Sequence, residues 1–251
     1  MYALAATVLY AINVPCSKLL LTEVPPVFMA GLLYLGSEIG VGLLWLVHNC
    51  RKNLIFTYES NLRNMKSFKP NSWLLPQPVL IIGTYDKNGK PNAMNAAWGG
   101  QWDSHEIMIS LGSHQTTDNL AVNPDFTVTF ATVENMVAAD YVGIASGRKT
   151  PDKMGKTGWT ITKAPNVNAP VFGNFPITLE CRLTQKIGES TEGYNLVAEI
   201  VNILCEEEYL AADGKPDMEK MGLIIFNPIH HTYIQLGKKV GNAFSDGNKL
   251  K

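Results

Sequence analysis

The charged residues of this chain are distributed so unevenly that the sequence divides near residue 50. The 251 residues include 43 Asp, Glu, Lys and Arg, yet only Lys18, Glu23 and Glu38 lie among the first fifty. A water-soluble domain needs a charged surface, whereas a stretch with almost no charge suits hydrocarbon. Two regions with different surroundings are therefore predicted, and the second is long enough for one domain with its own core.

The first region contains two apolar stretches, residues 2–21 and 26–48, each long enough to cross a bilayer as a helix. Pro25 and Pro26 suit a turn followed by a helix start. A cleaved signal peptide is disfavoured because no positive charge precedes the first stretch and a second apolar stretch follows at once. The sequence predicts a transmembrane hairpin in the cell membrane.

The position of the basic residues predicts the topology of this hairpin. Arg51 and Lys52 follow the second stretch directly, and positive residues favour the cytoplasmic side. The predicted organisation is a hairpin over 1–50, a linker over 51–64 and a cytoplasmic domain over 65–251. Without the hairpin, the protein is expected to be cytoplasmic.

Residues 11–36, A-I-N-V-P-C-S-K-L-L-L-T-E-V-P-P-V-F-M-A-G-L-L-Y-L-G, resemble the opening helices of the drug/metabolite transporter (EamA) family. The resemblance rests on the spacing of Asn13, Lys18 and the Pro25-Pro26 pair. Two helices cannot enclose a solute path. A membrane anchor or a fused remnant is therefore expected, rather than transport.

Composition also excludes several functions for the second region. Its twenty basic and twenty acidic residues balance, so it has no electrostatic footprint for nucleic acid. The four cysteines are far apart and form no pattern typical of a metal site or a disulfide framework. No G-x-G-x-x-G or P-loop motif occurs, so any nucleotide must be held in another way.

Strand patterns dominate the second region. The run V-L-I-I-G-T-Y from Val79 is followed by D-K-N-G-K, in which Asn88-Gly89 suits a tight hairpin. One helix is expected over 134–145. Many short strands with few helices favour an antiparallel barrel, and the further strands rich in β-branched or aromatic residues are 106–111, 126–131, 177–186 and 196–206.

A first polar cluster, residues 92–100, combines small residues with Asn95 and Trp98. Small residues let a ligand approach the backbone, and an amide offers both a donor and an acceptor. Such a wall suits a planar heteroaromatic ligand. The alternative is a packed strand with Trp98 in the core.

A second cluster, residues 110–119, carries hydroxyls and His114 ahead of an expected short helix. Hydroxyls and free amides at a helix start can seat a phosphate. The alternative is ordinary helix capping by Thr116 or Thr117.

A third cluster, residues 139–153, ends a helix at Ser146-Gly147 beside Arg148 and Lys153. Either base could meet a phosphate. The alternative is a solvated loop with a glycine cap.

These three clusters and the segments on either side of them resemble the flavin reductase-like family, most closely its flavoredoxin-type members, over 65–251. The segment before the clusters is P-x-P-V-L-I-I-G-T-Y-D, and the segment after them is A-P-V-F-G-N-F-P-I-T-L-E-C-R-L. The resemblance implies a split β-barrel, antiparallel with a Greek-key arrangement, that binds FMN as a homodimer. It also implies electron transfer from NADH, NADPH or a protein donor to a small-molecule or protein acceptor.

The resemblance implies three groups of binding residues. Those that would flank the isoalloxazine are Asn95, Ala96, Ala97 and Trp98. Those that would hold the ribityl chain and phosphate are Ser110, Gly112, His114, Thr116 and Asn119. Those that would close the site are Ser146, Gly147 and Lys153, of which Lys153 best suits the phosphate or the anionic reduced flavin. His114 stands where related chains can carry a basic side chain, so the phosphate seat is expected to be less positive here.

Three functional hypotheses follow. The first is an FMN-dependent oxidoreductase, in which the cofactor carries the chemistry and no catalytic acid or base is needed. The second is a non-enzymatic FMN electron carrier. The third is a membrane-anchored interaction protein whose barrel only binds flavin.

Overall fold

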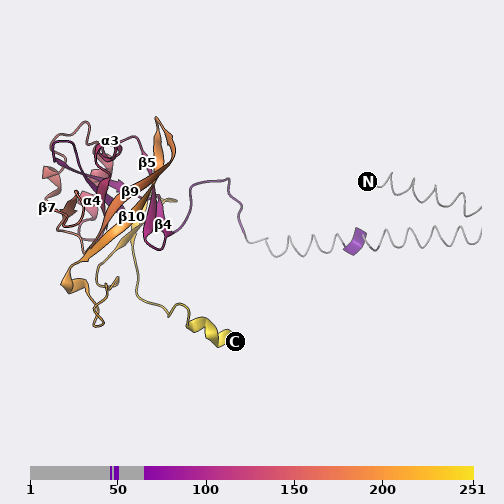
Figure 1. The fold of residues 1–251 in the computed structure, drawn as a ribbon. Helices are drawn as coiled ribbons and strands as arrows, with labels where there is room; N and C mark the ends of the chain where they lie inside the picture. Colours follow the sequence, from indigo (N-terminus) through magenta and orange to yellow (C-terminus); the bar gives the residue numbers. More distant parts are fainter. Residues whose placement is uncertain (1–45, 47, 51–64) are drawn as a thin grey trace, which may run out of the picture. The chain divides into compact units, whose positions relative to one another are not determined.

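The computed structural model describes residues 46, 48–50 and 65–251 (Figure 1). The chain divides into two compact units, Met1–Pro70 and Asn71–Lys251. In the first unit, Leu46 and residues 48–50 are helical. None of the helices in the described ranges has the length and apolar character needed to span a membrane. Nearly all of the predicted hairpin and the whole 51–64 linker lie outside the described residues.

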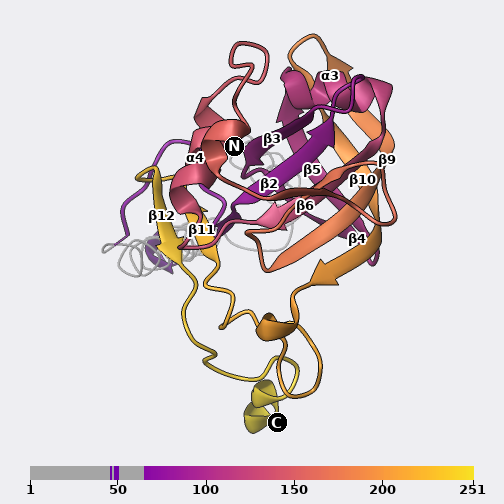
Figure 2. The ribbon, with the colours of Figure 1, turned by 90° about the vertical axis from the view of Figure 1, so that its left-hand side faces the viewer.

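The second unit is built on a seven-stranded sheet in which every neighbouring pair is antiparallel. The prediction of a mainly β, antiparallel fold is therefore confirmed. Figure 2 shows this sheet with helices at its margin. In spatial order its strands are β3 (Pro91–Ala96), β2 (Leu80–Tyr85), β6 (Asp125–Phe130), β9 (Ile177–Ser190), β10 (Gly193–Cys205), β5 (Glu106–Gly112) and β4 (Gly99–Asp103).

Smaller elements surround this sheet. A three-stranded sheet contains β1 (Gln77–Pro78), β11 (Ile224–Asn227) and β12 (Thr232–Gln235), and a two-stranded one contains β7 (Ile161–Lys163) and β8 (Pro170–Phe172). The α-helices α3 (Gln115–Val122) and α4 (Met136–Ile144) both contact β3. Short 3-10 helices span Gly155–Thr157, Glu207–Tyr209 and Asp246–Leu250.

The β2–β3 hairpin forms as predicted. Gly89 adopts φ +76°, the left-handed conformation that glycine accepts without strain. The Asp86 carboxylate accepts hydrogen bonds from the backbone N–H groups of Asn88 and Lys90, both at 2.8 Å. This turn fixes the register in which Leu80 faces Ala96, and so places β3 beside the helices.

Strand β2 separates two parts of the core. Leu80 and Ile82 pack into the barrel interior, whereas Val79 and Ile81 pack into a second cluster that includes Val142 of α4. Side chains alternate between the two faces of a strand, so β2 is buried on both sides. The second cluster holds α4 against the sheet, where it becomes one wall of the cavity described below.

Strand β9 carries a fully buried carboxylate. Glu180 is 0% exposed, and its oxygens accept hydrogen bonds from Asn166 N (2.8 Å), Asn166 Nδ2 (2.7 Å) and Asn202 Nδ2 (2.6 Å). Burial alone would raise the pKa of this carboxyl, but the hydrogen bonds outweigh it and lower the pKa below its ordinary value. The charge is satisfied within the protein.

Most of the predicted elements are present with shifted ends. The helix expected over 134–145 is α4, and the strand expected over 177–186 continues to Ser190. The exposed edge strand β4 was not predicted, because G-G-Q-W-D lacks an apolar alternation.

Candidate functional site

Three adjoining hollows form one continuous candidate site along β3, α3 and the end of α4. Their volumes are about 790, 250 and 100 Å³. Met94, Asn95 and His114 line both the widest hollow and the middle one. The middle and narrowest hollows share Asn92, Gln115, Gly147 and Lys153. The volume of the site therefore decreases from the hollow lined by Trp98 to the two hollows lined by Lys153.

The structure brings all twelve predicted site residues to this site. The widest hollow is lined by Asn95, Ala96, Ala97, Trp98, Ser110, Gly112 and His114. The middle hollow adds Thr116, Ser146, Gly147 and Lys153, and the narrowest adds Asn119. Their predicted contacts with a flavin stay predictions.

Asn95 is positioned by α4. Its Nδ2 donates a hydrogen bond to the Ala139 carbonyl oxygen at 3.0 Å, and a Cβ on Gly143 would lie only 3.0 Å from the Asn95 Cβ. No hydrogen bond to Asn95 Oδ1 comes from the described part of the chain, so this oxygen can accept one from a ligand. Nearby, Tyr233 donates to Asp140 Oδ1 at 2.6 Å. Burial and this hydrogen bond raise the pKa of Tyr233 to about 12.

Trp98 lies on the surface and not in the core. Its side chain is 58% exposed, which rules out the packed-core interpretation of the first cluster. Its carbonyl oxygen accepts a hydrogen bond from Ser110 N at 2.8 Å, which fixes the short β3–β4 connection against β5. The indole therefore lies at the wide cavity as an exposed aromatic wall.

The start of α3 differs from the capping alternative for the second cluster. The N-cap residue is His114, with extended backbone, and neither Thr116 nor Thr117 takes that place. Instead, the Thr117 hydroxyl accepts from His114 N (2.9 Å) and donates to His114 O (2.8 Å). A side chain at Gly112 would lie 3.0 Å from His114 Nε2, so glycine permits the close approach of the two residues.

Two of the predicted phosphate ligands are engaged inside the protein. Thr116 Oγ1 accepts a hydrogen bond from Asn92 Nδ2 at 3.1 Å. Asn119 donates to Thr84 Oγ1 and accepts from Gln115 Nε2, both at 2.9 Å. Asn119 therefore holds α3 against β2, and its amide is not directed to a ligand.

Lys153 is the buried cation of the site. It is only 5% exposed, and its Nζ forms no hydrogen bond or ion pair with any described residue. It lines both narrower hollows. Burial lowers its pKa from 10.5 to about 8. A buried charge without a partner is costly, so this position favours an anionic ligand.

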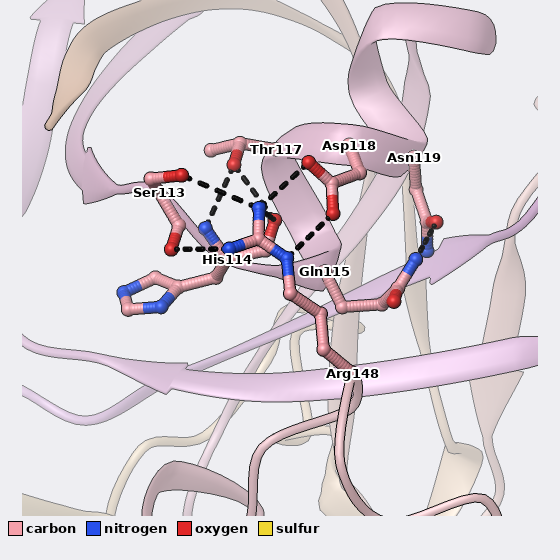
Figure 3. A network of polar contacts seen from close by, with 7 residues as sticks. All are labelled: Ser113, His114, Gln115, Thr117, Asp118, Asn119 and Arg148. Atoms are coloured by element: carbon pink, nitrogen blue, oxygen red, sulfur yellow. Dashed lines mark hydrogen bonds and ion pairs between the residues drawn. The ribbon is translucent and has the colours of Figure 1, made fainter. Parts of the chain in front are cut away.

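Arg148, the other predicted phosphate candidate, is already engaged. Its Nε and Nη2 donate to the two carboxylate oxygens of Asp118, both at 2.7 Å (Figure 3). Further bonds reach the Ser113 carbonyl oxygen, the Ser113 hydroxyl and the His114 carbonyl oxygen at 3.2 to 3.3 Å. The hydrogen bond from Arg148 lowers the pKa of Asp118 despite partial burial. Arg148 therefore organises the loop before α3.

The outer walls of the wide cavity were not predicted from the sequence. One wall is the end of the β9–β10 hairpin, with Gly188 of β9 and Glu192 of the turn, and another contains the rings of Phe226 and His231. The two rings lie parallel within 8°, with centroids 6.2 Å apart. The glycines of I-G-E-S-T-E-G signal a turn, but no local pattern shows that this turn reaches a cavity.

Residues 73–216 match the family model described as the flavin reductase like domain. The match covers more than half of the chain. This chain belongs to the flavin reductase-like family. The matched residues thus include every residue of the candidate site named from β3 to the β9–β10 turn. Residues 1–50, which resemble transporter helices, are outside the match and almost wholly outside the described residues.

Solved structures agree with this family. The flavoredoxin of Desulfovibrio vulgaris (Miyazaki F) is 32% identical, with a TM-score of 0.68, and the match covers 72% of this chain and 98% of that one. The flavoredoxin from Methanosarcina acetivorans is 28% identical, with a TM-score of 0.66 and coverage of 74% and 100%. The FMN-binding protein from Thermus thermophilus is 15% identical, with a TM-score of 0.57 and coverage of 71% and 99%, and shows the shared fold alone. No curated protein sequence matched this chain.

Proposed function

We propose that this protein binds FMN in the continuous site and works as an oxidoreductase that passes electrons from NADH, NADPH or a protein donor to an acceptor. The observation that carries the proposal is Lys153, a buried cation that has no partner among the described residues and lines the two smaller hollows of the site. A ligand with a planar ring system and an anionic end matches this shape and charge. The likeness to two flavoredoxins supports the same ligand.

The residues present fit each part of FMN. Lys153 would face the phosphate, because no acidic side chain in the described part of the chain pairs with its ammonium. Asn95 would accept a hydrogen bond from a ring N–H through its free Oδ1, and Trp98 would cover the ring. When bound, FMN supplies two-electron redox chemistry, and the protein's part is to orient it and set its electrostatic environment.

A second aromatic wall in the wide hollow favours an enzyme over a simple carrier. Binding sites for small molecules commonly have volumes of about 300 to 1,000 Å³, and this hollow alone measures about 790 Å³. Phe226 and His231 form a wall apart from the Asn95–Trp98 segment, so a second planar molecule could lie against them. The likeness to two flavoredoxins supports an FMN electron carrier as the second candidate function.

The test is the absorption spectrum of the full-length protein purified in detergent, before and after reconstitution with FMN. The expected result is bound flavin that is bleached by NADH or NADPH without oxygen. Flavin that stays oxidised would favour the carrier, and a protein that takes up no FMN would contradict both. The Lys153→Met variant, with Lys149→Met as a control in the same loop, shows whether uptake depends on the buried cation.

We also propose a homodimer, supported by the exposed apolar side chains of Trp98, Trp102, Val137 and Ile144. Light scattering of the detergent-purified protein, corrected for bound detergent, tests this.

Attachment to the membrane through residues 1–50 is proposed from their composition, with the flavin domain in the cytoplasm. A reporter fused after Lys251 should give a cytoplasmic signal. Membrane attachment without any flavin-dependent reduction would favour the anchored interaction protein.

A further inference from the structure

The middle hollow of the site lies between two walls that are far apart in sequence. One wall is the start of α3, with His114, Gln115 and Thr116, and the other is the segment from Gly143 to Gly147. Arg148 follows the second wall directly and crosses to the first, where it binds Asp118 and the Ser113–His114 backbone (Figure 3). The Arg148–Asp118 pair therefore connects both sides of the hollow.

The guanidinium of Arg148 has little capacity left for a ligand. Nε and both terminal nitrogens are each engaged in at least one hydrogen bond, and both oxygens of Asp118 accept. A direct phosphate ligand would need donors that are free. Lys153 lines the same hollow and has no partner among the residues that the structure describes. Arg148 is thus placed to control access to the hollow, and Lys153 to hold what enters.

The pair can also open. The side chains of Arg148 and Asp118 are 43% and 50% exposed, so water competes for their hydrogen bonds when the contact breaks. The segment that carries Arg148 is a compact turn, in which Lys149 N and Thr150 N both donate to the Ser146 carbonyl oxygen. Such a turn can move as a unit when its outer contact is lost.

We propose that Arg148 and Asp118 form a latch across the middle hollow that sets how fast the phosphate end of FMN enters and leaves. The latch rests on the proposed function, because its ligand is FMN. It acts on the rates of exchange, whereas Lys153 acts on the affinity. A slow exchange would make the flavin a resident group and not a diffusing substrate.

A second ion pair provides a matched control. Arg182 Nε donates to Asp125 Oδ1 at 2.7 Å and Nη2 to Asp125 Oδ2 at 3.3 Å. Arg182 and Asp125 are partners in register on β9 and β6, which backbone hydrogen bonds already join. Loss of the Arg182 side chain therefore opens no hollow.

The experiment measures FMN association and dissociation rates by stopped-flow flavin fluorescence in Asp118→Asn, Arg148→Gln and Arg182→Gln. Each latch variant is expected to raise both rates about five- to tenfold, while Kd changes by less than about threefold. The Arg182→Gln rates should match the wild type. The Asp118→Asn/Arg148→Gln double variant should be no faster than either single one, because both remove the same contact.

Two results would overturn the latch. Wild-type exchange rates in FMN-loaded Asp118→Asn would show that the contact does not control access. Weakened binding in Arg148→Gln alone, with tight binding retained in Asp118→Asn, would make Arg148 a direct ligand. A wild-type protein that takes up no FMN would instead overturn the proposed function, and with it the ligand of the latch. Circular dichroism establishes that each variant is folded.

Discussion

Glu180 and Lys153 are both buried charges, but the protein treats them in opposite ways. Glu180 is surrounded by amide donors from Asn166 and Asn202, and these hydrogen bonds lower its pKa despite burial. Lys153 has no partner among the described residues, and burial lowers its pKa to about 8, so its charged form is disfavoured. A charge satisfied internally stabilises a fold, whereas a charge left without a partner beside a cavity indicates a ligand.

The largest effect is expected from Glu180→Ala. The variant empties the fully buried space of the Glu180 side chain and takes the acceptor from the amides of Asn166 and Asn202, so the free energy of unfolding should fall by about 3 kcal/mol or more. Urea unfolding measures this. The exposed Glu189→Ala should change it by less than about 0.5 kcal/mol. An unchanged stability in Glu180→Ala would show that this network is not structural.

Lys153→Met should give the opposite pattern. The Kd for FMN should rise about 100-fold, which corresponds to about 2.7 kcal/mol, because a phosphate would lose its cation. The free energy of unfolding of the flavin-free protein should stay constant or rise by about 1 kcal/mol, since an unpaired buried charge is removed. Fluorescence titration and urea unfolding test the two parts. A large loss of stability would make Lys153 a structural residue like Glu180.

The pH dependence follows from the lowered pKa of Lys153. Above pH 8 the flavin-free protein loses this proton, so binding of a phosphate must take up a proton, and the affinity for FMN should fall about tenfold per pH unit. Over pH 8 to 10.5 the unfolded chain keeps the proton that the folded chain has lost. The Lys153 contribution to flavin-free stability should therefore rise with pH. Both trends should vanish in Lys153→Met, and a pH-independent wild-type affinity would contradict this account.

The smallest effect is expected from Gly147→Ala. The new Cβ would lie 2.5 Å from Asn92 Oδ1 and 2.9 Å from the Gln115 Cβ, so the wall of the hollow must shift. We expect a Kd for FMN about fivefold higher, or about 1 kcal/mol. Gly100→Ala, whose Cβ would meet nothing within 4 Å, is the control in the same titration. Equal affinities in the two variants would show that this wall does not touch the ligand.

Local sequence patterns predicted the buried strands well, because a strand that is buried on one or both faces has a recognisable pattern of apolar residues. The β2–β3 hairpin followed from Asn88-Gly89, and β5, β6, β9 and β10 followed from runs of β-branched and aromatic residues. The edge strand β4 was missed, since an exposed strand of glycine and polar residues has no such period.

The site residues were predicted from the family resemblance more than from the chemistry of the individual residues. Composition alone left Trp98 in either the core or a cavity wall, and only its surroundings in three dimensions decide the matter. The Arg148–Asp118 pair joins residues that are 30 apart, and nothing local signals such a partner. The sequence also does not show that Glu180 has hydrogen-bond partners whereas Lys153 has none among the described residues, because the fold determines which groups lie beside each charge.

The most direct test of the central claim compares FMN with riboflavin, which lacks the phosphate, in the wild type and in Lys153→Met. The affinities are measured by fluorescence titration at pH 7. The wild type should bind FMN about 100-fold more tightly than riboflavin, and Lys153→Met should bind both with nearly equal affinity. A wild type that does not distinguish the two flavins, or a preference for FMN that survives the loss of Lys153, would contradict it.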